Sequence, residues 1–138
     1  MLPSGTLDPS FWNGGKVVFP VSAPKLDAPA TGLAIQSDGK ILIATQSDAG
    51  NGQNDNMSVL VQLMPDGTLD ATFADNGKLF LNIYPGLHEL IDVLILNTDG
   101  MIYLAARHSA ATNSSPPVLV RLFSDGTLDP SFGNVGLA

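Results

Sequence analysis

The chain has 138 residues and no cysteine, and its 13 acidic and six basic side chains give a net charge of −7. This length is enough for one domain with a buried core. The lack of cysteine excludes disulfides and thiolate zinc sites, and an acidic chain without a basic cluster argues against a nucleic-acid partner. A hydrophobic content of 44% with 14 glycines and 10 prolines is typical of an all-β protein with buried strands.

Nothing in the sequence predicts a membrane span or a Sec-type signal. No apolar run approaches the roughly 18 residues that a membrane helix needs. The first residues, Met1–Phe11, lack the basic and apolar regions of a secretory signal. We therefore expect a chain that is cytoplasmic or is released by another route, with its localisation otherwise open.

One phrase occurs three times along the chain. Its copies read SGTLDPSFWNGGKVVF from Ser4, DGTLDATFADNGKLFL from Asp66 and DGTLDPSFGNVGLA from Asp125. A second phrase recurs out of step with the first, as SDGKILIA from Ser37 and TDGMIYLA from Thr98. A repeat of roughly sixty residues is too long for a helical solenoid unit and fits a four-stranded propeller blade.

Apolar runs between the turns predict the strands in chain order. A first strand is expected at 16–19, followed by strands at 33–35, 41–44, 59–64 and 78–81 and by strands at 93–96, 102–105 and 118–123, with a last strand only starting at 136–138. A polar loop is expected at 47–56. Asp38-Gly39 predicts a two-residue hairpin, because Gly readily takes the positive φ of such turns. We assign 1–138 to a single domain, with repeat 1 at about 15–76 and repeat 2 at about 77–138.

The recurring phrase predicts a turn and a plug. Asp8-Pro9 and Asp129-Pro130 predict type I turns in which the Asp side chain accepts nearby N–H groups. Ala71 stands at the equivalent place in the middle copy, so proline there helps but is not required. The Leu and Phe of each copy are expected to fill the gap between neighbouring sheets as core residues. They are Leu7, Leu69, Leu128, Phe11, Phe73 and Phe132.

These phrases resemble the bacterial delta-60 repeat, a β-propeller repeat. Its pattern has a DGK turn, a third strand, and then a DG-S/T-LD-x-x-F-G phrase that leads into a Gly-Lys strand. Asp38-Gly39-Lys40 matches in full, and Asp99-Gly100-Met101 departs at its last residue. Trp12 and Ala74 stand where Gly usually follows Phe, whereas Gly133 keeps it. The strand start is carried by Gly15-Lys16 and Gly77-Lys78. The resemblance implies an all-β propeller fold and says little about activity.

Two blades cannot close a propeller, because closed rings need about four to eight. The strand at 16–19 has no blade of its own, and the second blade lacks its outer strand. We therefore expect a head-to-tail homo-oligomer, with a trimer favoured, in which the N-terminal strand passes to the neighbouring chain. Two other interpretations stay open: the chain is part of a longer repeat protein, or it is a compact two-sheet sandwich.

No candidate catalytic, cofactor or metal residues emerge. His88 and His108 lie in different repeats without a shared acid and are interpreted as dispensable loop or strand-end residues. The acidic loop from Asp48 to Asp55 does not match a calcium-loop spacing and is interpreted as a solvated turn. Arg121 is expected to run along the sheet toward solvent. Trp12 is the one large departure from the repeat and is a candidate interface or ligand-stacking residue.

The sequence therefore favours a protein that is not an enzyme. We expect a binding or structural propeller module whose ligand is a protein or a glycan. The alternatives are a hydrolase or lyase that uses the central face of the propeller, and a small toxin or attachment protein of bacterial or phage origin. The fold cannot choose between these functions, because propellers carry many.

Overall fold

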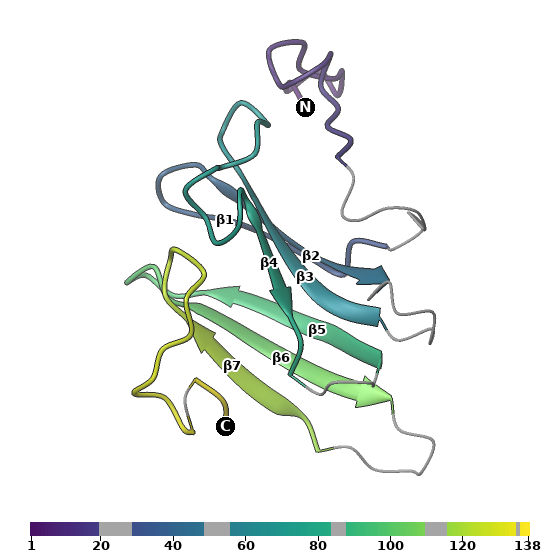
Figure 1. The fold of residues 1–138 in the computed structure, drawn as a ribbon. Helices are drawn as coiled ribbons and strands as arrows, with labels where there is room; N and C mark the ends of the chain where they lie inside the picture. Colours follow the sequence, from purple (N-terminus) through teal and green to yellow (C-terminus); the bar gives the residue numbers. More distant parts are fainter. Residues whose placement is uncertain (20–28, 49–55, 84–87, 110–115, 135) are drawn as a thin grey trace.

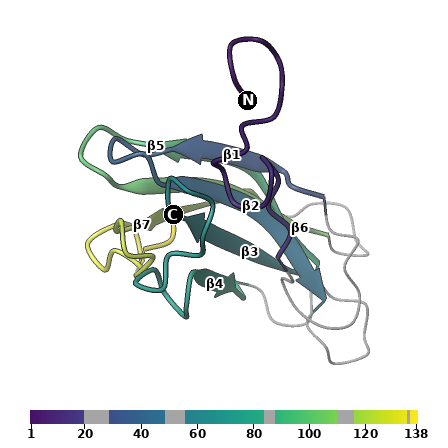
Figure 2. The ribbon, with the colours of Figure 1, turned by 90° about the horizontal axis from the view of Figure 1, so that it is seen from above.

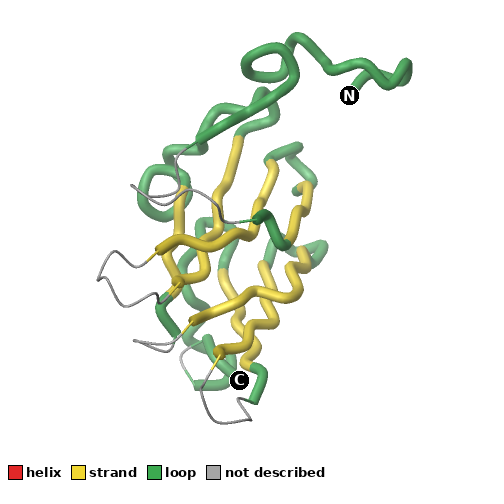
Figure 3. The backbone as a smooth tube through the Cα atoms, turned by 90° about the vertical axis from the view of Figure 1, so that its right-hand side faces the viewer, coloured by secondary structure: helices red, strands yellow, loops and turns green. Residues whose placement is uncertain are grey.

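The computed structural model describes residues 1–19, 29–48, 56–83, 88–109, 116–134 and 136–138. Within these ranges the chain forms strands joined by turns, and Figure 3 shows no helix among them. Nor do these ranges contain any helix that is long and apolar enough to cross a membrane. The all-β prediction is confirmed.

The strands form two antiparallel sheets that match the two repeats (Figure 1). The first sheet is β1 (Gly32–Ile35), β2 (Ile41–Asp48), β3 (Asn56–Leu63) and β4 (Lys78–Leu81), adjacent in that order. The second sheet is β5 (His88–Leu96), β6 (Ile102–Ser109) and β7 (Val118–Leu122). Each strand overlaps a predicted apolar run, and β3 and β7 end one residue before the runs predicted at 59–64 and 118–123. The pairing of β2 with β3 continues to Asp48 and Asn56, so both ends of the predicted polar loop belong to strands.

The two sheets lie face to face, and the core fills the space between them (Figures 1 and 2). Leu42, Ala44 and Leu60 of the first sheet share one hydrophobic cluster with residues of β6 and β7. The residues of the second sheet in that cluster include Ile102, Leu104, Ala106, Val118, Val120 and Leu122. The repeat makes Ile102 equivalent to Ile41, and Val120 equivalent to Val61. The face of the first sheet that contacts the second is therefore not equivalent, in the repeat, to the face of the second sheet that contacts the first. Successive propeller blades stack in this way.

The predicted strand at 16–19 does not form. Lys16 makes only isolated bridges to Trp12 and Asn13, within its own turn. Val17 and Phe19 nevertheless pack against the face of the first sheet that is turned away from the second, in a cluster with Val59, Val61, Leu63, Ile41 and Ile43. This face is thus covered in part by the N-terminal segment rather than by a sheet.

The last residues pair with the outer edge of the second sheet. Leu137 bridges to Val120, and Leu119 and Ala138 exchange two backbone hydrogen bonds of 2.7 and 2.9 Å. This confirms the predicted start of a fourth strand at 136–138. Only the first sheet forms four complete strands within the described residues.

The hairpin between β1 and β2 is longer than predicted. Gly39 donates its N–H to the Gln36 carbonyl, and Gln36 donates to the Lys40 carbonyl. Gly39 has a φ of +84°, whereas Asp38 is not among the residues with positive φ. Gly39 thus follows a type I turn as a bulge residue, in place of the predicted two-residue turn. The glycine requirement was correct, and the loop length was wrong.

Candidate functional site

The recurring phrase folds in the same way in all three copies. The N–H of Phe11, Phe73 and Phe132 donates to the carbonyl of the Asp three residues earlier, at 3.0–3.1 Å. The Asp side chain accepts the N–H and hydroxyl of the residue two places on, for example Ser10 on Asp8 at 2.9 and 2.6 Å. The predicted type I turn is therefore confirmed, including the middle copy, where Ala71 replaces proline.

The Phe of the middle phrase is a buried plug, whereas Phe11 and Phe132 are half-buried and the Leu is exposed in all three phrases. Phe73 is 1% exposed, whereas Leu69 is 37% exposed and Leu7 and Leu128 are exposed as well. The prediction that Leu69 is a core residue is wrong. Its side chain instead lies over Gly77 of its own phrase, where an added Cβ would be 3.1 Å from Leu69 Cδ2. The Leu thus closes the turn locally and does not fill the gap between sheets.

The Phe of the first and of the second phrase reaches the Asp-Gly turn that begins the next phrase. A Cβ on Gly126 would lie 3.0 Å from the Phe73 ring, and Ala74 donates its N–H to the Asp125 carbonyl at 3.0 Å. In the same way a Cβ on Gly67 would lie 3.1 Å from Phe11 Cζ. The third phrase has no such receiving turn among the described residues, and Phe132 is only half-buried.

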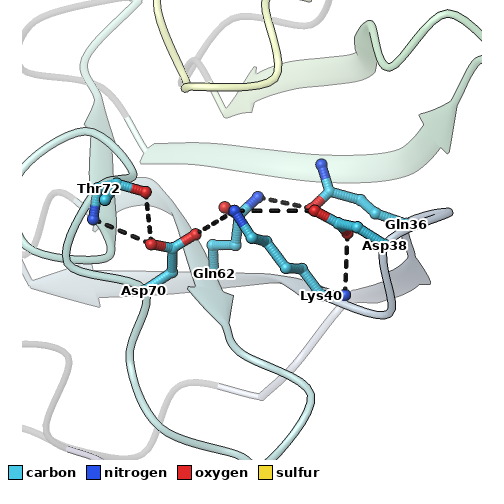
Figure 4. Close-up of polar contacts among 6 residues, drawn as sticks. All are labelled: Gln36, Asp38, Lys40, Gln62, Asp70 and Thr72. Atoms are coloured by element: carbon cyan, nitrogen blue, oxygen red, sulfur yellow. Dashed lines mark hydrogen bonds and ion pairs between the residues drawn. The ribbon is translucent and has the colours of Figure 1, made fainter.

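A polar network joins the two turns of the first sheet (Figure 4). Lys40 Nζ lies 2.8 Å from Asp70 Oδ2 and 3.8 Å from Asp38 Oδ2. Asp70 also accepts the N–H and hydroxyl of Thr72 at 3.0 and 2.6 Å. Beside it, Gln62 Nε2 donates to Gln36 Oε1 at 2.9 Å. The network fixes the phrase to the β1–β2 turn.

The network keeps a buried carboxylate ionised. Burial acts to raise the pKa of Asp70, but the hydrogen bonds from Lys40 and Thr72 outweigh it and lower the pKa below its ordinary value. The hydrogen bond to Asp70 in turn raises the pKa of Lys40. Both groups are therefore charged at neutral pH, so the arrangement is a fixed ion pair and does not resemble a proton-transfer site.

The second sheet holds the equivalent Asp129 with a different cation. Arg121 on β7 places an Nη 2.6 Å from Asp129 Oδ2 and donates to Ser131 Oγ at 3.0 Å. Its guanidinium also stacks 4.7 Å from the centre of the Phe132 ring. The Ser131 hydroxyl is the largest cause that lowers the pKa of Asp129, and it acts against burial. The expectation that Arg121 only runs toward solvent is therefore wrong.

A polar cavity opens where the network meets the second repeat. Its volume is about 300 Å³. Its polar lining comes from Gln36, Asp38, Lys40, Gln62 and Thr72 of the first repeat and from Ser124 and Asp125 of the second. The buried Phe73 is the one apolar residue of the described lining. The spacing of the phrases could not predict this cavity, because it depends on how one sheet is stacked on the next.

Trp12 lies at the junction between the first and second phrases. Its N–H donates to the Asp66 carbonyl at 2.8 Å, and its φ is +46°. This left-handed conformation explains why Gly is the usual residue at this place, because other residues adopt it at a cost. The side chain is 50% exposed. Trp12 thus fastens the N-terminal phrase by its backbone and leaves indole surface free.

Of the two histidine side chains, the structure describes only that of His108. The side chain of His88 and the loop residues 49–55 lie outside the described residues, as does the Asp48 side chain. His108 is opposite Glu89 in the β5–β6 register, and Glu89 is 2% exposed. No motif or repeat in the sequence pointed to this buried acid. Among the described residues no three His, Cys, Asp or Glu side chains gather as a metal site.

Comparisons with known proteins give the family and no ligand. No curated protein and no solved structure matches the chain. One family model, described as a domain of unknown function (DUF5122) beta-propeller, matches residues 36–73 and 97–132, more than half of the chain. Each match runs from an Asp-Gly hairpin to the Phe of the following phrase. The chain therefore belongs to the DUF5122 β-propeller family and carries two of its repeats.

Proposed function

We propose that the chain is a non-enzymatic binding and structural module of the bacterial delta-60 type. In this proposal several copies associate head to tail into a propeller ring, and the ring binds a protein or a glycan. Three copies would supply six blades, which lies within the four to eight of closed propellers. The proposal leaves localisation open.

One observation carries the proposal: the second sheet exposes the face by which the first sheet is buried. Leu60 is fully buried against the second sheet, and its equivalent Leu119 is 47% exposed. Val93 and Ile95, which correspond to Gly32 and Ala34 on the innermost strand, are 44% and 56% exposed. An apolar strip of this kind is typical of a surface that another subunit covers.

The mass of the chain in solution tests self-association. We expect light scattering at micromolar concentration to give three times the mass of one chain. Leu119→Glu places a charge on the exposed face and should yield monomers, whereas Asn82→Glu, at an exposed position after β4, is a comparison for added charge alone. A monomeric wild-type chain would overturn the ring.

The polar cavity supports a glycan ligand. Its amide, carboxylate, ammonium and hydroxyl groups suit the hydroxyls of a sugar. We expect a screen of oligosaccharides by NMR to shift the amides of Ser124 and Gln36. Ser124→Trp, which fills the cavity from its rim, should remove the response. Shifts confined to Trp12 would instead assign the ligand to the exposed indole.

A hydrolase or lyase is the second candidate, and one observation favours it. Glu89, a buried acid, stands opposite His108 at the start of β5, the innermost strand of its sheet. A carboxylate and an imidazole on one strand pair can act as acid and base. Turnover of ester or glycoside substrates that disappears in both Glu89→Gln and His108→Gln would favour this function over binding alone.

A further inference from the structure

We propose that residues 7–19 of a second copy replace residues 128–138 on the edge of β7, and that Arg121 exchanges its partner Asp129 for Asp8 of that copy. The proposal rests on the self-association proposed above. It goes further by naming the segment that is donated, the edge that receives it and the ion pair that changes partner.

Residues 7–19 contact the first sheet in the way that the middle phrase and β4 contact the second sheet. Phe11 and Trp12 contact Gly67 as Phe73 and Ala74 contact Gly126. Val17 and Phe19 pack on the first sheet, as their equivalents Leu79 and Leu81 pack on the second. Figure 1 shows this segment beyond the first sheet, on the side away from β7.

Within one chain, however, residues 7–19 have no neighbouring strand among the described residues with which their backbone can pair. In the middle phrase Asp70 donates its N–H to the Gln62 carbonyl and Gln62 donates to the Gly77 carbonyl. The equivalent backbone groups of Asp8 and Gly15 have no strand partner among the described residues. The Asp8 carboxylate is held by Ser10, and no Lys or Arg in the described part of the chain forms an ion pair with it.

The edge of β7 offers those missing partners. Arg121 now accepts the Asp129 N–H and donates to the Gly136 carbonyl, both in the third phrase. Asp8 and Gly15 are the equivalents of Asp129 and Gly136 in the first phrase. A donated first phrase would therefore meet both backbone groups of Arg121 and its guanidinium. Its Val18 would stand opposite Val118, one residue beyond the pair of Leu119 with Ala138.

Only one of the two segments can occupy this edge, and the donated one brings more contact. The resident segment 128–138 belongs to the same chain as β7 and brings no further sheet to the exposed face. The donated segment stays attached to its own first sheet, so it carries the Leu33 and Ile35 face of the second copy toward the exposed Ile95 and Leu119. The contact then repeats the packing of the two sheets within one chain. Asp125 and Gly126 remain in place, because Phe73 and Ala74 hold them.

An engineered disulfide tests the exchange in the full chain. Leu119 and Ala138 form a hydrogen-bonded pair, so the next pair, Val118 with Val18, is of the non-hydrogen-bonded kind. Its Cα separation of roughly 4.5 Å suits a disulfide. The chain has no cysteine of its own. The Val18→Cys/Val118→Cys variant should oxidise to covalent trimers, because within one chain the two residues lie apart. Val118 belongs to the cluster between the two sheets, whereas Val18 is 88% exposed and its neighbours Val17 and Phe19 pack on the opposite face of the first sheet.

Control variants distinguish the exchange of the segment from the formation of a ring. Val59→Cys/Phe80→Cys has the same register within the first sheet and should form an intrachain disulfide. Either single variant, Val18→Cys or Val118→Cys, should give little crosslinking. An oligomeric wild type whose double variant does not crosslink, while the Val59/Phe80 control does, overturns the exchange and leaves the ring standing. A monomeric wild type overturns both.

Two neutralising substitutions give a second, independent readout. Asp129→Asn weakens the resident segment and should strengthen assembly several-fold. Asp8→Asn removes the incoming partner of Arg121 and should weaken assembly several-fold. Sedimentation velocity across a dilution series measures both. Two shifts of the same sign would overturn the exchange, because a purely structural role predicts that both variants only lose stability.

Discussion

In the first sheet the buried Asp70 is paired with Lys40, whereas in the second sheet the equivalent Asp129 is paired with Arg121. The two cations come from different places. Lys40 precedes β2 and aligns with Met101, and Arg121 lies on β7 and aligns with Gln62. Met101 therefore breaks the DGK pattern without leaving the carboxylate unpaired. Each of the two sheets thus pairs its phrase Asp with a cation, which comes from the turn before β2 in the first sheet and from β7 in the second.

The two phrases also differ in what covers the plug. Phe73 is enclosed by Gly126 of the next repeat, while Phe132 rests on Arg121 and meets Tyr103 edge to face at 6.3 Å. The choice of cation and the cover of the plug are linked, because the guanidinium that pairs with Asp129 is the one that stacks on Phe132. The Phe ring of the first sheet is thus covered by the next repeat, whereas the Phe ring of the second sheet is covered by side chains of its own repeat.

The largest expected difference between the sheets lies in the plugs. Phe73→Ala should lower the free energy of unfolding by about 3–5 kcal/mol, because it removes a fully buried aromatic ring. Phe132→Ala should cost less than half of that, since its ring is only half-buried. Denaturant unfolding of both variants measures this, with Leu69→Ala as the exposed control. Equal losses for the two Phe variants would show that the second plug is covered by another subunit under those conditions.

Moving the cation of the first sheet from position 40 to position 62 should reproduce the ion pair of the second sheet. Lys40→Met alone leaves the buried Asp70 carboxylate without its cation and should lower Tm by about 3–8 °C. Adding Gln62→Arg supplies the guanidinium from the third strand, as Arg121 does, and should restore at least half of the loss. Differential scanning calorimetry compares the two variants. If the double variant is less stable than Lys40→Met, the two solutions are not interchangeable.

The strands could be predicted from the sequence because apolar runs end at Asp-Gly turns. β4 lies where it was expected, and β5 starts five residues earlier than predicted because polar residues continue its pairing with β6. The repeat also predicted Phe73 as a core residue. Each of these features depends on local sequence and on its recurrence.

Features that depend on stacking could not be predicted. Leu69 and Phe73 recur equally in the three phrases, yet only the sheet packing shows that the Leu stays exposed. Arg121 aligns with the uncharged Gln62 of the first repeat, so the comparison of repeats could not reveal its ion pair with Asp129. The cavity beside Lys40 takes its lining from two repeats. The recurrence of residues therefore predicts the strands and turns within one repeat, but not the contacts between neighbouring repeats.

The free energy of unfolding should depend on pH in the acid range because of the carboxylates that form ion pairs. The pKa of Asp70 is lowered in the folded chain, so its contribution is fully present above the ordinary value of 3.8 and is lost as pH falls through the lowered pKa. The raised pKa of Lys40 gives a contribution that is present below its ordinary value of 10.5 and is lost above the raised one.

Unfolding free energy should therefore fall less steeply below about pH 4 in Asp70→Asn than in the wild type. Asp129→Asn should have a similar effect, because the pKa of Asp129 is lowered as well. Urea unfolding between pH 2 and 7, at fixed ionic strength, gives the slopes. Parallel curves for the wild type and Asp70→Asn would mean that Asp70 keeps its ordinary pKa.

The smallest expected effect concerns the one position where the middle phrase lacks proline. Ala71 occupies the same turn as Pro9 and Pro130, and its N–H makes no hydrogen bond with the described backbone. Ala71→Pro should therefore fit the turn without strain and stabilise the chain by about 0.4–1 kcal/mol, through a less flexible unfolded state. Pro130→Ala should lose a similar amount. Thermal unfolding of the two variants measures both changes, and a destabilised Ala71→Pro would show that the middle turn is held differently from its two copies.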